Sequence, residues 1–281
     1  MSFTIPNKSA QVYASKPRGY IEASLTSTYA WWKMHQTSLT TLTESTAKTG
    51  FTGQTINGTT TNIWSANPGW FTPDVDATAA GNYVGIPLAQ SDELCSLTDL
   101  AGGVLVVARI KLPGTPPGSG ANAVFVYGAN DGNYSGVINY GGNVNLSGSL
   151  ELVGGANTSI TSQAITAMAG GDDFTVAWYF DVANRQMSHY TDIGAGVVAK
   201  TNAIPAGTLP GVGLAGSEGL GVLGRNNPAS TSRWNQSGHE ALIRDLFMIR
   251  FETDQSANIV SIVQGFADNG GVDLPTELEG L

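Results

Sequence analysis

The sequence predicts an all-β protein with one short helix near the C-terminus and an arm at the N-terminus. Short runs of alternating apolar and polar residues recur along the chain, and turn-forming residues separate them. Charged residues make up 12% of the 281 residues, about half of the roughly 25% in an ordinary globular domain, and Gly occurs 36 times. Few charges and many small residues suit a β protein rich in turns. This length allows one large β domain or two smaller units.

The clearest strand pattern lies at residues 174–181, FTVAWYFD. Successive side chains of a strand point to opposite faces, so two sets of four residues alternate here. One set is Phe174, Val176, Trp178 and Phe180, and the other is Thr175, Ala177, Tyr179 and Asp181. Other strands are expected at residues 82–87, 104–112, 123–127, 136–140 and 186–190, and Leu150 and Leu152 alternate with Ser149 and Glu151.

A turn-rich connection, ANDGNYS at residues 129–135, joins two of these strands as a hairpin. Asp131, Asn133 and Ser135 have the spacing that opens a calcium loop, and Gly136 stands in its sixth place. Gly142 occupies the twelfth place, where such a loop needs a bidentate Glu. A hairpin turn is therefore expected, with a weak calcium site as the alternative. No other metal or cofactor is predicted.

Residues 241–266 read as one strand that runs into one short helix, and earlier strands are expected to pair with it or pack against it. Thr253 or Asp254 is suited to cap the helix. One buried stripe is expected along the helix, which Gly265 is placed to end. Its members are Ile259, Val260, Ile262, Val263 and Phe266.

Residues 1–54 have weak helix and strand signals, and we interpret them as an arm or small subdomain. Trp31 and Trp32 would point to opposite faces of a strand, so that one is buried and the other exposed, or both pack against the main body. Residues 1–50 hold five basic and two acidic residues, a net charge of +3 that suits an acidic partner. The predicted partner-binding residues are Lys8, Lys16, Arg18, Trp31 and Trp32.

The rest of the chain holds eight basic and twenty acidic residues, a net charge of −12. An acidic body argues against nucleic acid and anionic membranes as partners. Residues 269–281 form an acidic tail that we expect to be exposed or bound to a partner. The single cysteine, Cys95, excludes an intrachain disulfide, and the sequence shows no signal peptide and no run of 18 apolar residues. These features predict a protein made in a reducing cytoplasm.

The order of elements resembles a laminin-G-like domain of the concanavalin A-like lectin/glucanase superfamily, over residues 55–268. Such domains run from a short strand ending in Pro, through a strand ending in Lys-Leu and a central Trp-bearing strand, to a closing strand with Ile-Asp before a short helix. Here Ile243 and Asp245 stand at that closing motif, with Arg244 inserted between them. The resemblance implies two antiparallel sheets in jelly-roll order. The matching segments are residues 82–87, 97–112, 172–181, 219–227 and 241–266.

Glucanases of this superfamily carry a Glu-x-Asp-x-x-Glu strand that places carboxylates on one face, and no such motif occurs here. The adjacent pairs Asp92-Glu93 and Asp172-Asp173 would diverge on a strand. No catalytic residue is therefore predicted, and a glycoside hydrolase is the least favoured alternative. His35, His189 and His239 share no metal-ligand spacing, and each is expected to be a surface or hydrogen-bonded polar residue.

Sugar sites in such sandwiches combine aromatic faces with nearby amides. A candidate set lies in predicted loops, where it would bind a glycan or contact a neighbouring subunit. It consists of Tyr134, Tyr140, Asn226, Asn227, Trp234 and Asn235.

The leading functional prediction is a non-enzymatic structural or interaction protein of a large assembly. Low charge, the arm, the acidic tail and the lack of a catalytic set resemble tailed-bacteriophage virion proteins, such as head (capsid) decoration or tail-associated subunits. The expected partners are other copies of the chain and other proteins of the assembly, and the expected location is the virion. The alternative is a carbohydrate-binding module or adhesin that recognises a surface glycan.

Overall fold

A computed structural model shows two antiparallel β-sheets packed face to face, which confirms the predicted sandwich. The structure describes residues 18–33, 41–43, 52–56, 83–111, 119–128, 132–141, 143–155, 157–159, 163–164, 173–192, 196–212, 219–222, 242–270 and 273–281.

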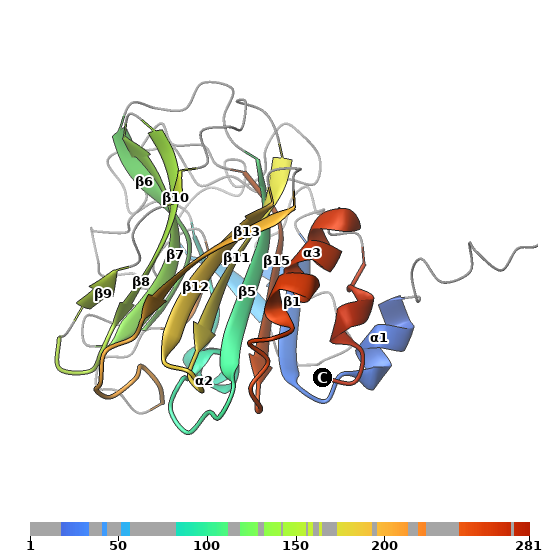
Figure 1. Cartoon of the computed structure of the whole chain (residues 1–281), viewed down its shortest axis with the longest axis horizontal. Coiled ribbons are helices and arrows are strands. Elements are labelled where there is room, and N and C mark those ends of the chain that lie inside the picture. Colours follow the sequence, from blue (N-terminus) through green and yellow to red (C-terminus); the bar gives the residue numbers. More distant parts are fainter. Residues whose placement is uncertain are drawn as a thin grey trace, which may run out of the picture.

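The six-stranded sheet has the order β1-β15-β5-β11-β12-β13, and its strands run through the centre of Figure 1. Every neighbouring pair in it is antiparallel. The strands are β1 (Thr28–Lys33), β15 (Leu242–Phe251), β5 (Gly103–Lys111), β11 (Asp173–Asp181), β12 (Gln186–Asp192) and β13 (Val197–Ala203).

The nine-stranded sheet has the order β10-β8-β7-β6-β14-β4-β3-β2, with β9 also paired to β8. The predicted hairpin, formed by β6 and β7, lies near the centre of this sheet. Strand β7 pairs in turn with β8. The strands are β10 (Gln163–Ala164), β8 (Asn143–Glu151), β7 (Asn133–Gly141), β6 (Ser119–Gly128), β14 (Gly221–Val222), β4 (Tyr83–Gly85), β3 (Thr52–Ile56), β2 (Thr41–Thr43) and β9 (Asn157–Ser159).

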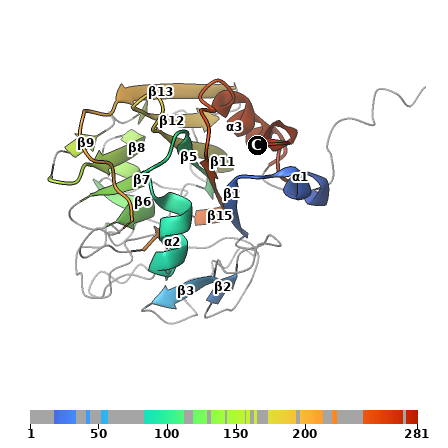
Figure 2. The ribbon, with the colours of Figure 1, turned by 90° about the horizontal axis from the view of Figure 1, so that it is seen from below.

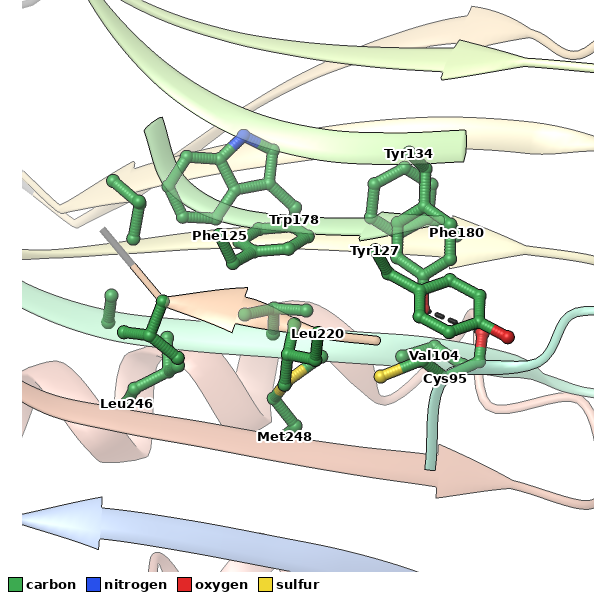
Figure 3. Close-up of a cluster of buried hydrophobic side chains, with 14 of the residues drawn as sticks. Cys95, Val104, Phe125, Tyr127, Tyr134, Trp178, Phe180, Leu220, Leu246 and Met248 are labelled. Atoms are coloured by element: carbon green, nitrogen blue, oxygen red, sulfur yellow. Dashed lines mark hydrogen bonds between the residues drawn. The ribbon is translucent and has the colours of Figure 1, made fainter. Parts of the chain in front are cut away.

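A first hydrophobic cluster fills the space between the two sheets (Figure 3). The predicted apolar face of β11 lies here, and Trp178 meets Phe125 of β6 edge to face, with ring centroids 5.3 Å apart. The Trp178 indole N–H donates to the Ser147 carbonyl oxygen at 2.9 Å, so the ring is fixed to β8 as well. A Cβ at Gly136 would collide with the Phe125 and Trp178 rings, which explains a glycine inside β7.

A second hydrophobic cluster covers the outer face of the six-stranded sheet. Helix α3 (Ile259–Asp268) lies on this face (Figure 1) and buries Ala177 and Tyr179 of β11. Strand β11 is therefore buried on both faces, although its second face carries polar residues. Burial on both faces explains why β11, near the middle of the sheet, is hydrophobic at almost every position.

The predicted helix is confirmed, but its ends differ from the prediction. Asn258 stands at the N-cap, whereas Asp254 accepts the Ser256 backbone N–H one turn earlier. Val260 is 46% exposed, while the rest of the stripe is buried. Gly265 lies inside the helix, and a Cβ there would meet the Pro275 and Glu277 side chains, so this glycine permits close packing.

Two further helices were not predicted, α1 (Arg18–Ser24) and α2 (Leu88–Cys95). Helix α2 lies across one end of the sandwich (Figure 2). The Tyr134 hydroxyl donates to the Cys95 carbonyl oxygen, and the Tyr127 hydroxyl donates to the Asp92 carboxylate, each at 2.7 Å. Burial raises the pKa of the Cys95 thiol well above its usual range, so Cys95 is a packing residue.

Arg244, the residue inserted in the closing motif, forms a β-bulge. The pairing of β15 with β5 shifts between Ile243 and Asp245, so Arg244 has no opposite residue. The bulge keeps Ile243 in the cluster between the sheets and Asp245 on the outer face.

The predicted arm and tail are corrected where the structure describes them. Strand β1 pairs with β15 along its whole length, because its two tryptophans fill the cores on both sides of the sheet. In the tail, Leu274 and Leu278 are buried in the second cluster, and the Leu281 carbonyl oxygen accepts the Thr26 and Ser27 N–H groups. Residues 28–33, Leu274 and Leu278 therefore pack with the sandwich.

Candidate functional site

The outer face of β7 and β8 carries a stripe of polar side chains that Val137 interrupts on β7. Tyr134 and Leu150 pair across these strands and point between the sheets, so the alternate residues point outward. We name this stripe the β7–β8 polar face. It consists of Asn133, Ser135, Asn139, Asn145, Ser147, Ser149 and Glu151.

Cross-strand hydrogen bonds order this face. The Asn133 amide donates to Glu151 Oε2 at 2.6 Å, and the Ser135 and Ser149 hydroxyls lie 2.7 Å apart. Asn139 donates to the Ser147 hydroxyl in the same way. Such pairs hold side chains in single rotamers and so lower the entropy that a ligand must remove on binding.

The β8 part of this face offers an amide, two hydroxyls and one carboxylate in a row, while Asn133 and Ser135 of β7 are buried. Asn145, Ser147, Ser149 and Glu151 are half-exposed at every second position of β8, about 7 Å apart for a typical strand. Together these groups can both donate and accept hydrogen bonds. Within β7 and β8 Glu151 is the one carboxylate, so these strands lack the pair that glycoside hydrolysis requires.

Some predicted ligand-binding residues fall in the described part of the chain. Tyr134 lies in β7 and is fully buried, so its prediction as a loop residue is wrong. Tyr140 also lies in β7, opposite Val144. Asn226, Asn227, Trp234 and Asn235 lie outside the described residues.

The predicted partner-binding tryptophans are both buried. Trp31 packs in the outer cluster under α3, and Trp32 packs between the sheets. The expected alternation is confirmed, but neither ring is exposed, because both faces of the sheet are covered. Arg18 begins α1, while Lys8 and Lys16 lie outside the described residues.

Of the three residues of the weak calcium candidate, two lie in a strand and one lies outside the described part of the chain. Asn133 and Ser135 belong to β7 and bond across to β8, whereas Asp131 lies outside the described residues. Within the described ranges, no three His, Cys, Asp or Glu side chains gather at a metal-binding distance.

An exposed aromatic platform is absent from the described side chains, since every aromatic ring among them is buried. The large hydrophobic residues that are exposed there are aliphatic, namely Leu88, Val198, Val212 and Val260. No described helix is long and apolar enough to cross a membrane.

The residues of the polar face were missed in the sequence, although a signal for them exists. The segment NVNLSGSLE alternates small polar with apolar residues through nine positions. The alternation at residues 149–152 predicted a strand, but not a recognition surface. A strand whose outward positions are all Asn, Ser or Glu is also a candidate polar recognition surface.

No protein-family model matches the chain, and no curated protein matches it. Among solved structures, the botulinum neurotoxin serotype C1 binding domain has a TM-score of 0.54 at 14% identity, over 83% of this chain and 50% of that chain. The serotype D/C VPI 5993 binding domain has a TM-score of 0.53 at 14% identity, over 84% and 51%. A protein of unknown function from Shewanella oneidensis MR-1 has a TM-score of 0.49 at 12% identity, over 86% and 97%. The likeness to the two toxin domains establishes the fold alone, and the chain spans about half of their length.

Proposed function

We propose that this chain is a non-enzymatic recognition module that binds a glycan on the β7–β8 polar face. One observation carries the proposal: β8 presents Asn145, Ser147, Ser149 and Glu151 outward in a row and half-exposed, and bonds from β7 order the last three of them. Each group donates to or accepts from a sugar hydroxyl, and no described group on these strands is arranged for bond cleavage.

The structural neighbours support this proposal at the level of binding. Botulinum neurotoxin type C, whose structure has a TM-score of 0.54 with this chain, depends on interaction with two ganglioside molecules to enter cells. The D/C binding domain has been solved with rat synaptotagmin II, a protein partner. Each of these domains is about twice as long as the region that this chain matches, so the choice between glycan and protein depends on the polar face itself.

Replacing Asn145 and Ser147 together by Ala tests the proposal. On a glycan array we expect the native protein to bind at least one glycan and the double variant to bind it at least tenfold more weakly, since several polar contacts are removed. Thr201→Val on β13 is the control, because it removes one hydroxyl from the other sheet and is expected to leave binding unchanged. No array hit, or equal binding by the double variant, contradicts the proposal.

A second candidate is a structural subunit of a large assembly, such as a virion head decoration or tail-associated protein. Strand β13 supports it, because it ends the six-stranded sheet and carries Val198, which is 44% exposed. An edge strand of this kind is a template for pairing with another chain. The low content of charged residues agrees with extensive subunit contacts.

The molecular mass of the protein in solution tests the assembly function. The comparison is the full chain against a chain that starts at Arg18, which keeps β1 in its sheet. If residues 1–17 drive assembly, light scattering shows oligomers of the full chain and monomers of the shorter one. Monomers in both cases, at concentrations of about 100 μM, contradict an assembly role.

A further inference from the structure

Strand β13 ends the six-stranded sheet, and Figure 2 shows it at the border of the molecule. All seven of its residues are exposed or half-exposed. Strand β1, at the opposite edge of the same sheet, is buried from Tyr29 to Trp32. Of the two edge strands of this sheet, β13 is therefore the accessible one.

The hydrogen bonds at the two ends of β13 show which of its backbone groups face outward. In an antiparallel pair, the backbone groups of successive residues point alternately toward the partner strand and away from it. The Ile204 N–H donates to the Arg185 carbonyl oxygen at 2.7 Å, so the even-numbered residues of β13 bond to β12. The Val197 N–H donates instead to the Gln264 side chain of α3 at 3.1 Å. The odd-numbered residues consequently point away from β12.

The outward-facing backbone groups in the middle of the strand belong to Ala199, Thr201 and Ala203. Among the described residues, no group bonds to their N–H and C=O groups on this side. Edge strands are usually protected by prolines, bulges or charges. Here the three side chains are small, and Lys200 is the one charged residue of the strand. This edge can therefore pair with another strand.

We infer that two copies of this chain pair through β13, antiparallel, with Thr201 opposite Thr201 of the second copy. In this register Ala199 of each copy lies opposite Ala203 of the other. Each of these three pairs exchanges two backbone hydrogen bonds, about six in total. The two six-stranded sheets then form one continuous sheet across a two-fold axis.

The ends of the free edge favour this register. A shift toward the start of the strand brings Val197 into the pairing, and its N–H is already bonded to Gln264. A shift toward the end of the strand brings in Pro205, which has no N–H to donate. The register centred on Thr201 uses every free group and avoids both.

The charge of Lys200 favours the same register. A pairing centred on Lys200 would place two like charges directly opposite each other, which is destabilising. With Thr201 at the centre, Lys200 lies opposite Asn202 of the second copy, and this occurs twice in the dimer. The two lysines are thus kept apart, and each meets a neutral amide.

The contact is small, so we expect a weak dimer. A single strand edge buries less surface than the roughly 1,200–2,000 Å² of stable complexes, and we expect a Kd on the order of 100 μM. Glycan binding is not required for this dimer, because β13 belongs to the sheet opposite the β7–β8 polar face.

Sedimentation equilibrium of the full chain, from about 10 μM to about 1 mM, measures the dimer. Ala199→Pro removes one outward N–H and none of the bonds to β12, and proline is tolerated at such edge positions. We expect this variant to dimerise at least tenfold more weakly. Ala199→Ser keeps the N–H and is the control, which should dimerise like the native protein. Thermal melts establish that each variant is folded.

Two variants of Asn202 test the register. Asn202→Asp places a carboxylate opposite Lys200 twice in the dimer and should strengthen it by between about twofold and thirtyfold. Asn202→Lys should weaken it by a similar factor. Ala89→Asp on α2 adds the same charge at an exposed position at the end of the sandwich, and it should leave the affinity unchanged.

Each outcome supports or overturns the pairing. A dimer that Ala199→Pro weakens and Asn202→Asp strengthens supports it, whether or not a glycan binds. Monomers at about 1 mM overturn it and leave the edge to a strand of another protein. Oligomers that Ala199→Pro does not weaken form through another surface and also overturn it. A dimer that Asn202→Asp leaves unchanged contradicts the register.

Discussion

Trp31→Ala is expected to lower the free energy of unfolding by about 3–5 kcal/mol, the usual cost of truncating a buried tryptophan. Trp31 is fully buried and contacts Phe247 of β15 and Phe266 of α3, so its loss leaves a cavity between sheet and helix. Domains are typically stable by only 5–15 kcal/mol, so this is a large fraction of the total. Chemical denaturation of the native and variant proteins measures the difference.

The same experiment distinguishes a sheet strand from an arm. Val198→Ala on exposed β13 serves as the control and should change stability by about 0.5 kcal/mol or less. If Trp31→Ala has an effect as small as the control, residues 28–33 do not belong to the sheet. A loss of several kcal/mol with an unchanged control establishes β1 as part of the sandwich.

Acid is expected to destabilise the protein through His189, by on the order of 3 kcal/mol between pH 6.5 and 4. His189 is fully buried on β12, between Trp178 of β11 and Lys200 of β13. Neither ring nitrogen has a hydrogen-bond partner among the described residues. Burial, and then the charge of Lys200, lowers the pKa of His189 from 6.5 to about 4. Between these two pH values the unfolded chain binds a proton that the folded chain does not, so stability falls as pH falls.

His189→Leu isolates this effect from that of the carboxylates. The variant should match the native protein at pH 7, because replacing a buried, unpartnered polar group by an apolar one costs little. At pH 4 it should be more stable than the native protein by about the 3 kcal/mol given above. Urea denaturation at pH 7, 5.5 and 4 measures the difference, and a difference that does not change with pH contradicts a buried neutral histidine.

The strand prediction succeeded where one face of a strand repeats a simple pattern. The alternation at residues 174–181 predicted β11. The inserted Arg244 was noted in the sequence, but the β-bulge that it forms was not predicted. The alternation is a local signal, because the two-residue period is a property of a single strand.

The parts that the sequence did not reveal depend on contacts between distant segments. Residues 28–33 resembled an arm because the partner of β1 lies more than 200 residues away in β15. His189 was predicted to be a surface or hydrogen-bonded residue, yet it lies in the core because its strand is covered by the nine-stranded sheet.

Mapping of a bound glycan by ¹H–¹⁵N NMR is the most direct test of glycan binding on the β7–β8 polar face. An array hit is added to the labelled full chain, and the shifts of assigned backbone amides are followed. We predict the largest shifts at Asn145, Ser147 and Ser149 of β8 and at Asn139 of β7, with small shifts across β12 and β13. A glycan that binds without shifting β7 and β8 contradicts the central proposal.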